Sequence, residues 1–293
     1  MRGAPGEVSA VVVNYRTAEL TVACVASLRA EGVADVVVVD SASGDDCGSR
    51  LATADPAAIW VPLPTNRGYG AAVNAGVART RGSTILVCNA DLVVGAGTVA
   101  ALVGALAGER AAVAGPRIDQ PDGTRYPSAR TFPSLADAAG HGFVGLITTA
   151  NPWSRRYLRS EATAAGPVDW VSGACFAVRR EAWESVGGFD ERYFMFSEDV
   201  DLCWRLHHLG WEVVYEPGGR VVHLEGASRA SAPYRMVLAH HRSLLRFGWR
   251  TAPPRDRAIF PVVAVGLGLR TVVLWARLAG RALRPSASLG RRG

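Results

Sequence analysis

Four consecutive valines at positions 36–39, followed by Asp40, constrain the fold of this chain more than any other feature. A β-branched run without a polar face suits a strand that is buried on both sides, so it predicts a central strand of a parallel sheet. The same alternation of apolar strand and helix recurs through the first third of the chain. The other predicted strands there span residues 8–13, 59–61 and 84–88, and the predicted helices span 20–30 and 71–79. This alternation predicts an α/β fold with a doubly wound, mostly parallel sheet.

The second half of the chain begins near residue 112 with stretches rich in Pro, Ser and Arg that have no clean period. We expect an elaborated half that is related to binding. Later in this half, strands are predicted at 170–178, 211–215 and 220–223, and a short helix at 181–186. No GxGxxG follows the first strand and no GxxxxGK(S/T) occurs, so dinucleotide-binding and P-loop interpretations lose their main support.

Glu198 and Asp199 lie at the predicted start of a helix that ends at Gly210. Ser197 is expected to cap this helix, and carboxylates in a first turn are stabilised by about 0.3 to 1 kcal/mol each. That interpretation needs no function. The aromatic run at 193–196 instead favours a pocket wall, where a carboxylate that stays ionised near neutral pH acts as a general base for a hydroxyl nucleophile. The stretch by itself favours neither interpretation over the other.

Polar side chains follow several of the predicted strands, namely Asn14, Tyr15, Asp40, Asn66 and Asp91. The carboxyl ends of parallel strands meet at one edge of a sheet, and open α/β sheets bind their ligands there. The sequence therefore predicts that these side chains converge on one crevice.

Asp91 comes directly after a buried strand, and His223 ends a later one. A carboxylate so placed suits Mg²⁺ or Mn²⁺, which take protein carboxylates together with phosphate oxygens of a substrate. Each residue also has a plainer interpretation, Asp91 as a loop cap and His223 as a structural histidine. Taken together with Glu198 and Asp199, the two residues favour a divalent metal site.

Charge is distributed unevenly along the chain. Residues 242–293 contain eleven Arg and one Asp, a net charge of +10, whereas the preceding 241 residues carry −4. The overall +6 therefore does not describe a uniformly basic nucleic-acid-binding protein. The five cysteines are scattered without CxxC spacing, which indicates neither disulfides nor a zinc site and fits a reducing cytoplasm. We expect no signal peptide, because no basic start followed by a long apolar segment is present.

The C-terminal segment 251–293 has its own pattern. Its apolar run at 258–269 has twelve residues, fewer than the roughly 20 that a spanning helix needs, and Arg270 follows. On a continued helix, Arg277, Arg281 and Arg284 each lie within about 40° of Arg270. The sequence predicts a basic amphipathic tail that lies on the anionic membrane surface with this Arg stripe facing the lipid. Packing of the same helix against the body is the alternative.

A series of motifs in chain order resembles the inverting glycosyltransferases of family 2, which have the GT-A fold. Within about residues 7–245 these motifs are VVVNY, VVVDSAS, NRGYGAAVNAG, NAD in place of DxD, WVSGACFAVRR, GGFDERYFMFSEDVDLCWRL and VVHLEG. More narrowly, YPSARTFPSL, NPW, GGFDERYFMFSEDVDL and LAHHRS are similar to actinobacterial rhamnosyltransferases that act on N-acetylglucosaminyl-diphospho-polyprenol. The resemblance implies one GT-A catalytic domain at 1–250, with a nucleotide-sugar half at 1–115 and an acceptor half at 116–250.

The resemblance also implies roles for single residues. Asp199 would be the catalytic base, with Glu198 as the alternative, and Asp91 and His223 would contact Mg²⁺ or Mn²⁺. The residues implied to bind the nucleotide sugar are Asn14, Tyr15, Asp40, Asn66, Gly68, Asn74 and Asn89. Those assigned to the acceptor are Trp170, Ser172 and Gly173.

The implied reaction is the transfer of L-rhamnose from dTDP-L-rhamnose to a hydroxyl of a polyprenyl-diphosphate-linked sugar in cell-wall assembly. It would take place at the cytoplasmic face of the membrane, without a nucleic acid partner. One displacement inverts the anomeric centre, a base takes the acceptor proton, and a metal ion neutralises the leaving diphosphate. The alternatives are a family 2 transferase with another donor, such as UDP-galactofuranose, and a non-catalytic nucleotide-sugar-binding module. A nucleotidyltransferase is disfavoured, because the first strand is not followed by a Gly-rich basic loop.

Overall fold

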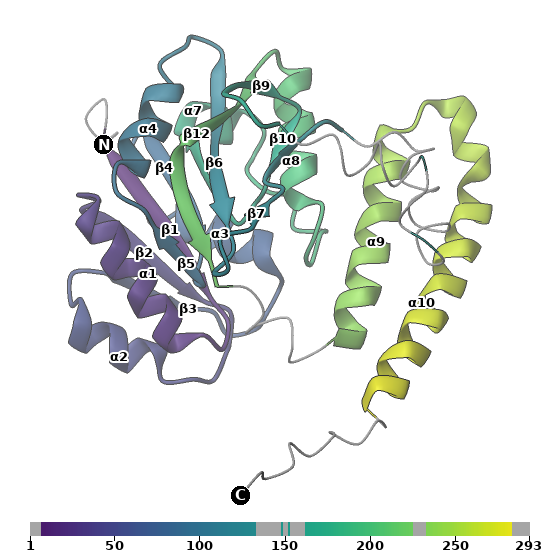
Figure 1. Ribbon diagram of the computed structural model, residues 1–293, viewed down its shortest axis with the longest axis horizontal. Coiled ribbons are helices and arrows are strands. Elements are labelled where there is room, and N and C mark those ends of the chain that lie inside the picture. The colour runs from purple at the N-terminus through teal and green to yellow at the C-terminus, as the bar shows by residue number, and fades with distance from the viewer. Residues whose placement is uncertain (1–6, 133–147, 149–151, 153–161, 225–232, 283–293) are drawn as a thin grey trace, which may run out of the picture.

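The computed structural model describes residues 7–132, 148, 152, 162–224 and 233–282 (Figure 1). Within these residues, a ten-stranded sheet has the order β3-β2-β1-β4-β11-β6-β12-β5, with β7 beside β6 and β9 beside β12. A separate pair is formed by β8 and β10. The strands are β1 (Val8–Asn14), β2 (Asp35–Asp40), β3 (Ile59–Pro62), β4 (Thr84–Asn89), β5 (Leu92–Val94), β6 (Ala111–Asp119), β7 (Arg125–Tyr126), β8 (Ala129–Arg130), β9 (Gly166–Val168), β10 (Trp170–Val171), β11 (Cys175–Arg179) and β12 (Glu212–His223).

The main strands of the sheet are mostly parallel, as the sequence predicts. β1 pairs in parallel with β2 and β4, β2 with β3, and β6 with β12. β11 runs antiparallel to both β4 and β6, and β5 runs antiparallel to β12. The doubly wound α/β prediction is confirmed.

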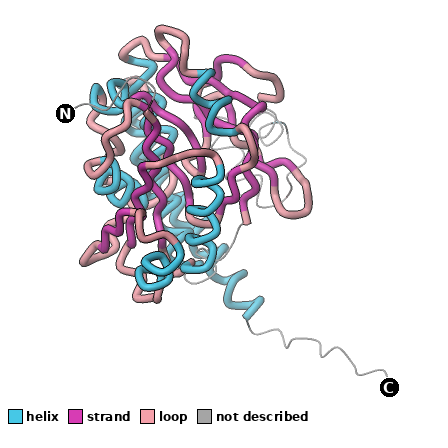
Figure 2. The backbone as a smooth tube through the Cα atoms, turned by 90° about the vertical axis from the view of Figure 1, so that its left-hand side faces the viewer, coloured by secondary structure: helices cyan, strands magenta, loops and turns pink. Residues whose placement is uncertain are grey.

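Helices cover both faces of the sheet (Figures 1 and 2). Along β1, Ala10 and Val12 pack into one apolar core and Val11 and Val13 into the other, because side chains alternate between the faces of a strand. Both faces are buried, so the valine runs lack a polar period. The first core is covered by α1 (Ala18–Ala30), α2 (Cys47–Ala54) and α4 (Thr98–Ala105), and the second by α3 (Tyr69–Val77), α7 (Arg180–Ser185) and α8 (Glu198–His208).

The predicted single strand at 170–178 is wrong, because the structure divides it into β10 and β11 in different sheets. The turn between them directs the backbone N–H of Gly173 to Asp199 and that of Ser172 to the Ser128 carbonyl. Conversely, the two strands predicted at 211–215 and 220–223 form one irregular strand, β12. The sequence analysis also missed β6, which pairs along most of its length with β12 in the interior of the sheet.

Two long helices stand beside the sheet as an antiparallel pair (Figure 1). They are α9 (Pro233–Thr251) and α10 (Phe260–Ala282), joined by the 3₁₀ segment Pro254–Ile259. α9 packs on the loop before α8, where Ser243 donates to the Met195 carbonyl at 2.9 Å. α10 packs on the other side of α9 through Phe260, Leu267 and Thr271, which are buried. The division of the chain at residues 115 and 250 stays a prediction.

The predicted lipid-facing position of Arg270 is wrong. Its guanidinium donates to His241 Nε2 on α9 at 3.2 Å, and His241 Nδ1 lies 2.6 Å from Thr271 Oγ1. Burial and the nearby Arg270 charge lower the pKa of His241 to about 4, so the ring is neutral and accepts this bond. Arg277 is exposed, while the side chains of Arg281 and Arg284 lie outside the described residues. Arg270 therefore faces α9 and not the lipid.

Apolar side chains instead occupy the outer face of α10. The exposed ones are Val262, Val265, Leu269, Val272 and Val273, whereas Trp275 donates its Nε1–H to the Tyr234 carbonyl of α9 at 3.1 Å. In the part of the chain that the structure describes, the stretch Pro254–Ala279 is the one helix whose length and composition would allow it to cross a membrane. α10 is thus longer than the apolar run at 258–269, because the helix does not end at Arg270 but continues to Ala282.

Candidate functional site

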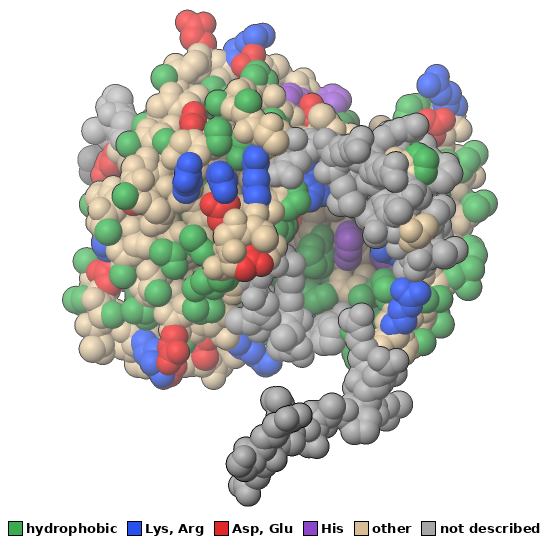
Figure 3. Space-filling model, in the orientation of Figure 1, with side chains coloured by type: hydrophobic (Ala, Val, Ile, Leu, Met, Phe, Trp, Pro, Cys, Tyr) green, Lys and Arg blue, Asp and Glu red, His purple; other side chains and the backbone are tan. Residues whose placement is uncertain are grey.

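A cavity of about 400 Å³ lies at the carboxyl ends of β1 and β4, and residues of α9 form part of its wall. The same side of the molecule is hollowed between the sheet and the helix pair (Figure 3). Most of the predicted site residues line this cavity, and of the five strand-end residues expected to converge, Tyr15, Asn66 and Asp91 do so. Those lining it are Tyr15, Asn66, Gly68, Asn89, Asp91, Trp170, Ser172, Gly173, Glu198, Asp199 and His223. Asn14, Asp40 and Asn74 do not line it.

Asn14 and Asp40 hold the strand ends in place beside the cavity. Asn14 Nδ2 donates to Asp40 Oδ1 at 2.8 Å, and Asn14 Oδ1 accepts bonds from the hydroxyls of Thr17 and Thr21 at 3.0 and 2.9 Å. Asn14 is fully buried, so its amide has little capacity left for a ligand. Asn74 plays a similar part, since its side chain bonds both the N–H and the carbonyl of Phe189. These residues position the site and do not face it.

Gly68 is fixed by close contact between two chain segments. Its φ is +101°, and a Cβ at this position would lie 2.1 Å from the Phe194 carbonyl oxygen. The same oxygen accepts the N–H of Tyr69 at 2.9 Å. Glycine is therefore required here, because it alone allows the start of α3 to approach the segment that precedes α8.

The acidic pair opens α8 as predicted, but Ser197 does not cap the helix with its side chain. Phe196 and Ser197 have φ values of 70° and 63°, a left-handed conformation that is costly for residues other than glycine. The Ser197 hydroxyl makes no capping hydrogen bond. The strained turn instead directs Glu198 and Asp199 toward the cavity, and such strain is characteristic of functional sites.

The expectation that the acidic pair stays ionised because of its helix position is wrong for Glu198. Glu198 is 6% exposed, its Oε2 has no hydrogen-bond partner, and burial and the Asp199 charge raise its pKa to about 8. Burial also raises the pKa of Asp199, but the N–H groups of Gly173 and Val200 oppose this rise by donating to its oxygens at 2.8 and 2.9 Å. Desolvation outweighs the helix dipole for Glu198. The pair therefore carries its negative charge on Asp199.

Asp201 is a structural carboxylate that the sequence analysis missed. It is fully buried, and its Oδ2 lies 2.7 Å from Arg205 Nε. Arg205 also donates to the Val186 and Gly188 carbonyls at 2.6 and 2.8 Å. Arg250 of α9 approaches the other carboxylate oxygen at 3.4 Å. Asp201 thus ties α8, the loop before it and α9 together.

Asp91 and His223 lie side by side, as predicted, with His223 Nε2 3.0 Å from Asp91 Oδ1. Strand pairing causes this, because His223 is opposite Leu92 in the β12–β5 ladder. Among the described residues no group of three or more His, Cys, Asp or Glu is placed to hold a metal ion. One carboxylate and one imidazole at a cavity wall fit Mg²⁺ or Mn²⁺ only when a ligand's phosphate oxygens complete the coordination.

The remaining cavity wall includes residues that the sequence analysis did not assign. Tyr69 donates its hydroxyl to the Gly173 carbonyl at 2.7 Å, and Phe196 packs against His240 of α9 with ring centroids 5.1 Å apart and ring planes tilted by 43°. Arg235 of α9 also lines the cavity. The segment LAHHRS was the only sequence signal that pointed to α9.

Comparison with known families gives two matches. The chain matches glycosyl transferase family 2 over residues 9–187 and glycosyl transferase family group 2 over residues 132–279. Over 248 residues it is 38% identical to the N-acetylglucosaminyl-diphospho-decaprenol L-rhamnosyltransferase of Mycobacterium tuberculosis, with 78% of this chain and 81% of that protein covered. Over 120 residues it is 32% identical to rhamnosyltransferase WbbL of Escherichia coli, with 41% and 43% covered.

Solved structures share the fold. The mannosyltransferase PcManGT from Pyrobaculum calidifontis, in complex with GDP-Man and Mn²⁺, matches with a TM-score of 0.57 and 19% identity, over 96% of this chain and 82% of that one. TarS of S. aureus (residues 1–349) matches with a TM-score of 0.55 and 14% identity, over 96% and 76%. These likenesses concern the fold alone, and they confirm the GT-A prediction.

Proposed function

Because this chain belongs to glycosyl transferase family 2, we propose that it transfers L-rhamnose from dTDP-L-rhamnose to a hydroxyl of a polyprenyl-diphosphate-linked sugar. The observation that carries the proposal is the 38% identity, over four fifths of its length, to an enzyme named for that reaction. The cavity supports it, since an acidic pair and the Asp91–His223 pair line the same space.

In this account Asp199 is the base. Its two oxygens are oriented by the N–H groups of Gly173 and Val200, while Glu198 keeps its proton and leaves the negative charge to Asp199. Asp199 takes the proton of the attacking hydroxyl, the new glycosidic bond forms, and the bond to the nucleotide diphosphate breaks in one inverting displacement. Phe196 and Phe247 line the cavity and exclude water, which disfavours hydrolysis of the donor.

The nucleotide sugar is proposed to bind along the opposite wall of the cavity. Tyr15 offers an aromatic face, while Asn66 and Asn89 offer amides for the donor's polar groups. Asp91 and His223 would hold Mg²⁺ or Mn²⁺ together with the diphosphate oxygens. Bound there, the ion would neutralise the charge that grows on the leaving group.

We further propose that α10 lies on the membrane surface. Its outer face is apolar, with Val262, Val265 and Leu269 each exposed by more than 60%. Exposure of such a face to water is unfavourable, and burial in a membrane interface removes it from water. A spanning orientation is disfavoured because α10 is packed along α9, which carries Arg242 and Arg246 and would have to enter the bilayer with it. α10 therefore anchors the protein peripherally, with the cavity near lipid-linked acceptors.

A donor panel tests the function. Purified protein is given N-acetylglucosaminyl-diphospho-polyprenol and, in parallel, dTDP-L-rhamnose, UDP-galactofuranose, UDP-glucose or GDP-mannose. We expect transfer of rhamnose to dominate. A clear preference for another donor would contradict the assignment of dTDP-L-rhamnose as the donor, while the protein would still be a glycosyltransferase. Binding of nucleotide sugar without turnover on any acceptor would favour the non-catalytic module.

A further inference from the structure

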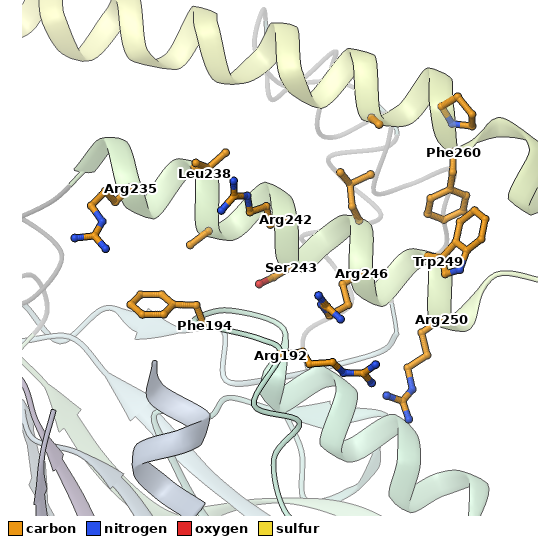
Figure 4. A pocket seen from close by; sticks show the side chains of 14 residues that line it. Arg192, Phe194, Arg235, Leu238, Arg242, Ser243, Arg246, Trp249, Arg250 and Phe260 are labelled. Atoms are coloured by element: carbon orange, nitrogen blue, oxygen red, sulfur yellow. The ribbon is translucent and has the colours of Figure 1, made fainter. Parts of the chain in front are cut away.

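A second cavity, of about 1090 Å³, lies between the segment 192–194 and the helices α9 and α10 (Figure 4). We call it the helix-pair groove. It contains none of the residues assigned above to catalysis or donor binding. It shares two lining residues, Phe194 and Arg235, with the cavity that holds Asp199. The two cavities are therefore neighbours.

One side of the helix-pair groove is a row of arginines. Arg235, Arg242 and Arg246 are spaced by seven and four residues on α9, which puts them within about 40° of one another on the helix. All three are exposed. Within the described part of the chain none of them forms an ion pair with a carboxylate, whereas Arg192 and Arg250 are both paired with Asp190 at the same edge. The row offers unneutralised positive charge to a ligand.

The other side of the groove is apolar. It is formed by Leu238, Leu245 and Trp249 of α9 together with Phe260 and Ala264 of α10. The Trp249 and Phe260 rings pack edge to face with centroids 5.3 Å apart, which fixes this wall. A groove with one cationic and one apolar wall suits a ligand that is an anion at one end and a hydrocarbon at the other.

We propose that the helix-pair groove binds the diphosphate and the first isoprene units of the lipid-linked acceptor, while the acceptor sugar reaches Asp199 past Phe194 and Arg235. The inference rests on the proposed function. Arginine binds phosphate oxygens through paired N–H groups, and three arginines without a carboxylate partner among the described residues match the charge of a diphosphate better than the single charge of most phospholipid headgroups. The α10 side of the groove leads the hydrocarbon toward the helix whose outer face meets the membrane.

The proposal is tested by direct binding of farnesyl diphosphate, a probe that carries no sugar. The donor cavity is first saturated with dTDP and Mg²⁺, and binding is followed by calorimetry. We expect the Arg242→Gln/Arg246→Gln variant to bind farnesyl diphosphate at least about tenfold more weakly than the wild type. Arg255→Gln/Arg277→Gln removes the same charge from the same part of the chain, outside the groove, and should bind like the wild type.

A third variant probes the apolar wall with the arginine row intact. Ala264→Trp fills the space beside Phe260, so it should weaken farnesyl diphosphate and leave the affinity for inorganic pyrophosphate unchanged. Equal affinities of the two arginine double variants for farnesyl diphosphate would overturn the proposal. So would displacement of the probe by short-chain phosphatidylglycerol at equal concentration, which would make the groove a headgroup site.

Transfer kinetics separate this inference from the proposed function. If both hold, Arg242→Gln/Arg246→Gln raises the KM for the lipid acceptor about tenfold and leaves the KM for dTDP-L-rhamnose unchanged. Absence of rhamnosyl transfer by the wild-type protein would contradict the proposed function. Wild-type transfer with an unchanged acceptor KM in the variant would contradict the groove assignment alone.

Discussion

Asp199 Oδ2 accepts the backbone N–H of Gly173 at 2.8 Å, across 26 residues of chain. The turn between β10 and β11 therefore orients the carboxylate that opens α8. A Cβ on residue 173 would lie 3.1 Å from Asp199 Cβ, a tight contact, so glycine leaves room for this approach. The proposed base is thus fixed by the sheet as well as by its own helix.

The buried carboxyl of Glu198 should make stability depend on pH. Burial raises its pKa from 4.5 to about 8, so between these values the folded protein keeps a proton that the unfolded chain loses. This contribution to stability is fully present below pH 4.5 and is lost as the pH rises through about 8. Glu198→Gln should therefore reduce the difference in unfolding free energy between pH 5 and pH 8 by up to a few kcal/mol. Denaturant unfolding at both values checks this. An unchanged difference would contradict the raised pKa.

Metal removal should abolish transfer if Asp91 and His223 hold an ion against the diphosphate. EDTA should stop rhamnose transfer, and added Mn²⁺ or Mg²⁺ should restore it. Asp91→Asn should also weaken Mn²⁺ binding in the presence of dTDP, measured by the electron paramagnetic resonance of free Mn²⁺. Full activity of the metal-free protein would leave neutralisation of the leaving group to arginine side chains.

Loss of Arg205 should destabilise the fold much more than loss of an exposed arginine. Arg205→Ala leaves the fully buried Asp201 without its nearest cation, and breaking a buried ion pair costs about 3 to 5 kcal/mol. Arg50→Ala is the matched control, because its partners Glu19 and Asp46 are exposed and such pairs contribute about 0 to 1 kcal/mol. Chemical denaturation compares the two. Similar losses would mean that Asp201 is not held by Arg205.

Membrane association should depend on the outer face of α10. Val265→Glu/Leu269→Glu places two charges on this exposed face without touching its contacts with α9. The variant should sediment with anionic vesicles much less than the wild type does. Arg255→Gln/Arg277→Gln should lose less, since the account assigns the main contribution to apolar burial. Equal sedimentation of wild type and the Glu variant would refute an anchoring α10.

The sequence was sufficient for the parallel strands β1 to β4 and for the placement of Asp91 and His223 in one crevice. Strands such as 36–39 are buried on both faces and consist of β-branched residues, a composition typical of central strands. Asp91 follows β4 and His223 ends β12, and the pairing of β12 with β5, which begins at Leu92, brings the two side chains together across 132 residues. Where local pattern and tertiary structure agree in this way, sequence reasoning succeeds.

Non-local contacts account for what the sequence did not predict. The protonated state of Glu198 follows from burial by the surrounding fold, and no local pattern encodes that burial. The position of α9 against the body depends on contacts such as that between Arg250 and Asp190, 60 residues apart in the chain. Arg270 has the period of a surface stripe, yet its guanidinium donates to His241 on another helix.

The most direct test of the account is the turnover of Asp199→Asn. The substitution keeps the size of the side chain and removes its ability to take a proton, so kcat should fall by about 10² to 10⁴ while the Kd for dTDP-L-rhamnose is unchanged. Glu198→Gln should lose far less at pH 7, because Glu198 is already protonated there. A fall of less than about tenfold in Asp199→Asn, or a larger loss in Glu198→Gln, would contradict Asp199 as the base.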